Sequence, residues 1–154
     1  MIQRIQSVYL LLATIAVAVA AFMPIGQFTG IEAAATYAFK PLGVPLPDGG
    51  YQSTWGLFGL LLLAAIVELC TIFLYRARML QVRMTIFASL LLVGFYIAFA
   101  AFFFILKGGL FADEATFRIG WALCLPLVGL ILNYLAFRGI YRDELLVRAI
   151  DRLR

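Results

Sequence analysis

The chain has 154 residues, of which 65% are hydrophobic and 13% are charged, and its formal net charge is +4. Soluble domains contain about 45–50% apolar and about 25% charged residues. A soluble fold of this length has too little interior to bury so much apolar surface. The composition therefore predicts an integral membrane protein. Its basic residues flank long apolar runs and form no basic patch with interleaved aromatics, so we expect no nucleic-acid binding.

Four apolar runs are long enough to cross a membrane as helices, which takes about 20 residues each. They cover residues 5–23, 55–75, 84–106 and 119–137. The first run could be a cleaved signal peptide, because Arg4 precedes it and Ala16-Val17-Ala18 resembles a cleavage site. We expect an uncleaved helix, because the apolar run continues through Met23. In the fourth run, Pro126 should kink the helix.

The segment 24–54 is the longest connection and is rich in proline. Residues 36–39 could form a short strand, and Asp48-Gly49 could close a hairpin. We interpret this segment as an ordered cap over the bundle, with a ligand-binding loop as the alternative. In the second, shorter loop, residues 107–118, we interpret Asp113 and Glu114 as solvating residues that stop the third helix.

The tail, residues 139–154, has the pattern of an amphipathic helix. Leu146, Val147, Ile150 and Leu153 share one face through i, i+3, i+4, i+7 spacing. Such a basic helix can lie on the inner membrane surface. Docking on a partner is the alternative.

The basic residues predict the orientation of the chain. With the amino terminus inside, nine of the twelve lysines and arginines fall in the inner segments. The opposite orientation would reverse this ratio against the positive-inside tendency. We therefore predict a multi-pass protein of the bacterial inner membrane with both termini in the cytoplasm.

Small residues form stripes on two of the predicted helices. Such stripes let membrane helices approach each other closely, so we interpret them as helix-packing faces. In the third helix the stripe is Gly94, Ala98 and Ala101, and in the fourth it is Ala122, Gly129, Asn133 and Ala136.

Glu68 is the only charged residue inside the second run, about 12 Å from its inner end at 1.5 Å per residue. A carboxylate at such a depth costs at least about 2.5 kcal/mol unless it is protonated, paired or facing water. Candidate partners are Asn133 at a similar depth, Thr71 on the same face, and Arg4, Arg76 or Arg83 reaching inward. Glu68 is then either a buried packing residue, which we favour, or a proton or cation relay.

Histidine is absent, which removes His-ligated metal or haem and any nucleophile paired with histidine. Cys70 and Cys124 lie near opposite ends of different apolar runs, too far apart for a disulfide. We expect both to be free thiols that act as small packing residues. No nucleophile, metal or cofactor constellation is present, so we predict that the protein is not an enzyme and has no cofactor.

The two ends of the chain carry a family resemblance. Met1-Ile2-Gln3-Arg4-Ile5-Gln6-Ser7-Val8-Tyr9-Leu10, the stretch from Arg138-Gly139-Ile140-Tyr141-Arg142 to Arg154, and the four-span pattern resemble small four-helix membrane proteins typical of Bacteroidota. That family is known as a domain of unknown function. The resemblance implies a bacterial inner membrane and brings no activity, substrate or site.

Together these features predict an all-α fold in a single domain: an integral membrane four-helix bundle with a cytoplasmic amphipathic C-terminal helix. For its function we favour a non-catalytic accessory or scaffold subunit of a larger membrane assembly. Its partners would then be the lipid bilayer and another protein or a second copy of itself. The alternative is a small proton-coupled carrier that uses Glu68 and works as a homodimer.

Overall fold

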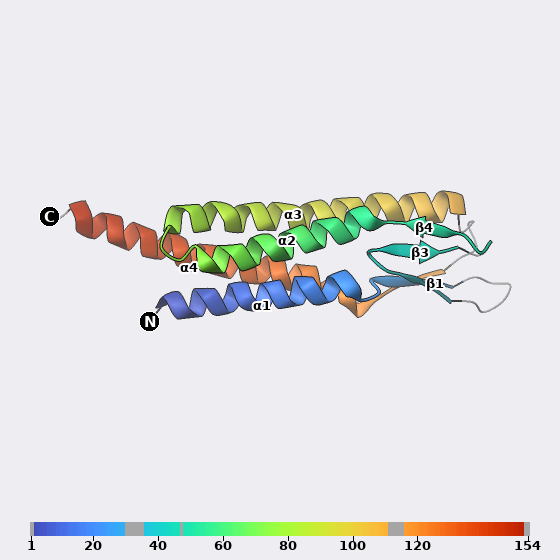
Figure 1. Ribbon diagram of the computed structural model, residues 1–154, viewed down its shortest axis with the longest axis horizontal. Helices are drawn as coiled ribbons and strands as arrows, with labels where there is room; N and C mark the ends of the chain where they lie inside the picture. The colour runs from blue at the N-terminus through green and yellow to red at the C-terminus, as the bar shows by residue number, and fades with distance from the viewer. Residues whose placement is uncertain (1, 30–35, 47, 111–115, 153–154) are drawn as a thin grey trace.

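The computed structural model describes residues 2–29, 36–46, 48–110 and 116–152, and this part of the chain contains four α-helices. They run side by side, with the strands gathered at one end and both termini at the other (Figure 1). Their bounds are α1 Ile2–Phe22, α2 Trp55–Phe73, α3 Arg78–Ile105 and α4 Cys124–Arg152. By length and composition, each of these four is apolar enough to cross a membrane.

The helices pack in a ring. Both α1 and α3 pack against α2 and α4, so α2 and α4 lie diagonally across the bundle. The inward face of α2 follows helical spacing, with Leu57, Leu61, Ala64, Glu68 and Thr71 all buried. Large apolar residues cover the outside of the same helices, as at Phe73 and Ile97. A bundle that is apolar both inside and outside is the arrangement expected of membrane helices.

The fourth helix differs from its prediction in three ways. Ile119 belongs to a strand, and a 3₁₀ turn, Trp121–Leu123, precedes the helix. Pro126 therefore lies in the first turn, where its missing N–H breaks no internal hydrogen bond, so the predicted internal kink has no basis. The tail is not a separate helix, because α4 continues without a break to Arg152.

Contact with α1 explains why the helix continues through Gly139. Ile140 is buried, and a Cβ at Gly139 would lie 3.1 Å from Gln6 Cγ on α1. Beyond this contact, Leu146 and Val147 of the predicted apolar face are exposed. The side chain of Ile150 and the whole of Leu153 lie outside the described residues.

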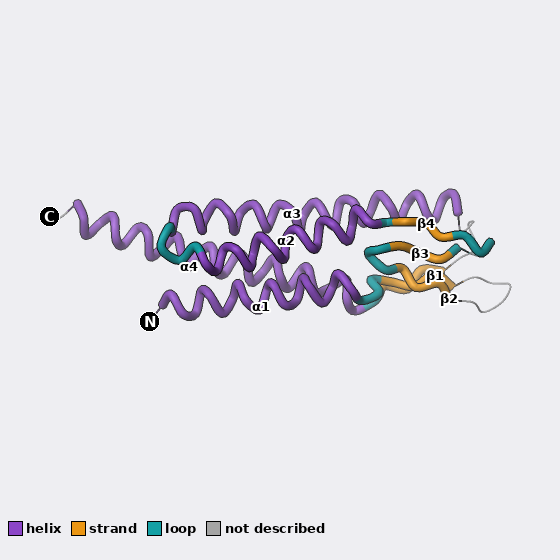
Figure 2. Tube along the Cα trace, in the orientation of Figure 1, coloured by secondary structure: helices purple, strands orange, loops and turns teal. Residues whose placement is uncertain are grey.

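Strands form a cap at the end of the helices opposite the two termini (Figure 2). An antiparallel sheet has the order β2-β1-β5, and β3 pairs with β4 as a hairpin. The predicted strand at 36–39 and the hairpin turn are both present, and Gly49 in that turn has a φ of 81°. The all-α prediction is correct for the helices and wrong for this cap. The strand bounds are β1 Gly26–Thr29, β2 Thr36–Phe39, β3 Gly43–Pro45, β4 Tyr51–Ser53 and β5 Thr116–Ile119.

Phenylalanine rings attach this cap to α3. Phe28 and Phe117 have ring centroids 4.8 Å apart, Phe103 and Phe117 4.9 Å, and Phe39 and Phe99 5.6 Å. Such ring pairs add about 0.5–1.5 kcal/mol each beyond the apolar area that they bury. A Cβ at Gly26 would overlap the Phe117 ring, so β1 requires glycine there. The predicted helix-stopping residues Asp113 and Glu114 lie outside the described residues.

Candidate functional site

Glu68 and Asn133 meet in the middle of the bundle. Both side chains are fully buried, and Asn133 Nδ2 donates a hydrogen bond of 2.7 Å to Glu68 Oε1. Because Glu68 is on α2 and Asn133 on α4, this bond joins the two diagonal helices across the centre of the ring. Hydrogen bonds between membrane helices contribute about 0.6–2 kcal/mol each. The pair therefore fixes the rotation and depth of α2 relative to α4.

The other candidate partners of Glu68 lie elsewhere. The Thr71 hydroxyl donates to the backbone carbonyl of Val67 at 2.6 Å, within its own helix. Arg76 is exposed, with its guanidinium 5.8 Å from the Tyr75 ring centroid, and Arg83 is also exposed. The side chain of Arg4 lies outside the described residues.

Two oxygens of the pair retain hydrogen-bonding capacity. Among the described residues, neither Glu68 Oε2 nor Asn133 Oδ1 has a hydrogen-bond partner. Neither residue lines the cavities around Leu90, Arg83 and Gln6. The site is thus a closed polar contact in an apolar interior, and its single carboxyl group is the only group there that can exchange a proton.

Residues of the predicted stripe on α4 make room for this contact. Gly129, Asn133 and Ala136 are buried on α4, and Ala122 is buried in the 3₁₀ turn that precedes this helix. A Cβ at Gly129 would lie 2.8 Å from Val17 Cγ2 on α1 and 3.5 Å from Leu92 Cδ1 on α3. Only glycine permits this approach.

The stripe predicted on α3 does not pack in the same way. Gly94 has no atom within 4 Å of the position of a Cβ, and Ala101 is exposed, while Ala98 is partly buried against the core. Within one chain, Ala98 alone of these three residues packs against the core, because large residues such as Leu92 and Phe95 fill the inward side of α3.

Cys70 and Cys124 are free, as the sequence predicted, but both are exposed. They lie on the outer surface of the helices, so the prediction that they act as packing residues is wrong. Within the described chain, no three histidine, cysteine, aspartate or glutamate residues gather as a metal site would require.

Sequence reasoning missed a second polar contact, at the end of the bundle that holds both termini. Gln6 Nε2 on α1 donates a 2.7 Å hydrogen bond to Asp143 Oδ2 on α4, and Gln6 is almost fully buried. Gln81 and Thr85 are buried on α3 near the same end. Gln6 interrupts an apolar run, which was the available signal, but its partner lies in the segment predicted to be a separate tail.

The comparison with protein families gives a match over almost the whole chain. A profile described as "Domain of unknown function (DUF4293)" matches residues 2–153. A search of curated proteins gives no significant match. The matched family agrees with the resemblance seen at the two ends of the chain, and the chain belongs to this family of unknown function.

Proposed function

We propose that the chain is a non-catalytic protein of the bacterial inner membrane that serves as an accessory or scaffold subunit of a larger assembly. It spans the membrane four times with both termini in the cytoplasm. Four apolar helices of sufficient length support the spanning arrangement. Trp55 at the start of α2 and Trp121 in the 3₁₀ turn before α4 are 70% and 65% exposed, which suits a membrane interface.

The closed Glu68–Asn133 pair is the observation that supports a scaffold rather than a carrier. A residue that relays protons must exchange them with water on both sides of a membrane. Glu68 is fully buried, is hydrogen-bonded across the bundle and does not line the cavities around Leu90, Arg83 and Gln6. Such a residue is suited to fixing the relative position of two helices, and a scaffold needs that rigidity.

One observation favours the alternative, a small proton-coupled carrier that works as a homodimer. Within the described chain, Glu68 Oε2 and Asn133 Oδ1 have no partner, so the pair could bind a proton or a small polar solute after a rearrangement. Carboxyl groups within a membrane also have a functional role more often than not.

Substitution of Glu68 separates the two functions. Glu68→Gln keeps the shape and the acceptor oxygen but cannot ionise. For a scaffold we expect growth or assembly in a complemented deletion strain to stay within about twofold of wild type, with thermal stability unchanged or slightly higher. Stable protein with lost function would establish the carrier instead. Thr71→Val is the matched control, because the Thr71 hydroxyl donates its hydrogen bond within its own helix.

A further inference from the structure

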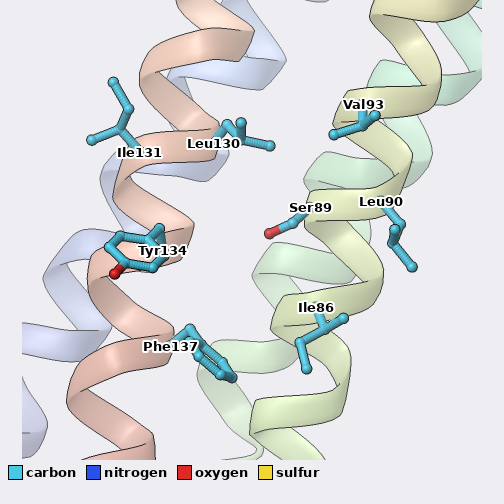
Figure 3. Close-up of a pocket in the computed structure, with 8 residues that line it drawn as sticks. All are labelled: Ile86, Ser89, Leu90, Val93, Leu130, Ile131, Tyr134 and Phe137. Carbon is cyan, nitrogen blue, oxygen red and sulfur yellow. The ribbon is translucent and has the colours of Figure 1, made fainter.

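An apolar cavity of about 510 Å³ opens between α3 and α4. Figure 3 shows Leu130 and Phe137 pointing from α4 toward α3, with Val93 pointing back toward α4. Ser89 also lines it, but its hydroxyl donates to the Thr85 carbonyl at 2.9 Å. Cavities of about 300–1,000 Å³ are typical of small-molecule sites, and this one is suited to an apolar chain.

A second cavity, of about 630 Å³, follows the first along the same two helices toward the inner end of the bundle. Arg76, Arg78 and Arg83 line it, together with Glu144 and Val147 from α4. We call it the arginine pocket. Three arginines against one glutamate give it a net positive charge. Arginine is the side chain best suited to bind phosphate oxygens, because its guanidinium donates two parallel hydrogen bonds.

The two cavities lie one helical turn apart on the same face of α3, and together we call them the track. Arg83 in the arginine pocket is one helical turn from Ile86 in the apolar cavity, and Leu90 and Val93 continue the same face. From Arg83 to Val93 the helix rises about 15 Å at 1.5 Å per residue. That length is half of the hydrocarbon core of a bilayer, which is about 30 Å thick. A positive pocket followed by an apolar track one leaflet deep matches a phospholipid with its phosphate at the arginines.

We propose that this track binds an anionic phospholipid of the inner leaflet, with one acyl chain between α3 and α4 and the head group in the arginine pocket. The inference rests on the proposed membrane topology, which places the arginines on the cytoplasmic side. A helix of a partner is a poorer occupant, because contacts between membrane helices use small residues. Apart from Ser89, this cavity is lined by branched and aromatic residues.

The test measures lipid retained by the intact protein. The full chain is reconstituted in nanodiscs that contain equal amounts of phosphatidylglycerol and phosphatidylcholine, extracted in mild detergent and analysed by native mass spectrometry. We expect one phosphatidylglycerol per chain. Arg78→Gln with Arg83→Gln should lower its retention about 25-fold, because each arginine near an anionic surface contributes a factor of about five. Val93→Trp should lower retention of the same lipid by filling the track.

Matched variants make the result specific. Arg138→Gln with Arg142→Gln removes the same charge from exposed positions outside both cavities, and Ile66→Trp adds a ring to an exposed position on α2. Both should retain the lipid as wild type does. Three results would overturn the proposal. These are equal retention of the two lipids, an equal loss of lipid from the Arg138→Gln with Arg142→Gln variant, and a measured mass of two chains that Val93→Trp reduces to the mass of one chain. If the chain fails to enter nanodiscs at all, the membrane topology itself is wrong.

Discussion

The two sides of α4 are packed in opposite ways. Toward α1, Gly129 lies so close to Val17 that a Cβ would be 2.8 Å from its methyl group. Toward α3, Leu130 and Phe137 line a cavity of about 510 Å³. Small residues let helix backbones approach, whereas branched and aromatic residues hold them apart. The bundle is therefore closed between α4 and α1 and open between α4 and α3, where the apolar cavity lies.

The closed side should be the more sensitive of the two to added volume. Gly129→Leu places four carbon atoms where α1 leaves no room, and Val17 is β-branched and cannot rotate freely away. We expect the free energy of unfolding to fall by about 3 kcal/mol, at the upper end of the cost of overpacking. Reversible unfolding in a mixed detergent series measures the change.

Gly94→Leu is the matched control for this substitution, because it adds the same atoms at a glycine whose Cβ position has no neighbour within 4 Å. It should not destabilise the chain, and replacing a mid-helix glycine should add roughly 0.5–1 kcal/mol of stability. If the two variants were equally destabilised, the contrast between the closed and open sides of the bundle would not hold.

The polar pair should show a smaller effect with a characteristic coupling. Glu68→Leu leaves the buried Asn133 amide without its acceptor, which costs about 1–2 kcal/mol of unfolding free energy. Adding Asn133→Leu removes the unpaired group and should recover part of that loss. A double-mutant cycle should give a coupling energy of about 1 kcal/mol. Additive effects would mean that the two side chains do not stabilise each other.

The helices could be predicted because each apolar run is long and polar, charged or proline residues bound it. The depth of Glu68 and Asn133 followed from their distances to the flanking arginines, which is why Asn133 could be named as a partner. The continuity of α4 could not be foreseen, because Gly139 resembles a helix end when its contact with Gln6 is unknown.

The cap was harder to predict for a different reason. β1 and β5 are four residues long and far apart in the sequence, with no alternation strong enough to indicate a strand. Their pairing depends on Phe117 packing against Phe28 and Phe103 over the end of α3. Such a contact between distant segments is invisible to local patterns. The prediction that Gly94 and Ala101 of α3 pack against a neighbouring helix failed for a similar reason. A stripe of small residues does not specify which side of a helix faces its neighbours.

Cysteine labelling in intact cells tests the membrane arrangement most directly. In a background of Cys70→Ser and Cys124→Ser, single cysteines are placed at Ser53 in the cap and at Ala77 between α2 and α3, both exposed positions. A membrane-impermeant maleimide should label the Ser53→Cys variant at once and the Ala77→Cys variant only after permeabilisation. Labelling of Ala77→Cys but not of Ser53→Cys in intact cells would contradict the orientation. Immediate labelling of both variants would contradict the four-span topology.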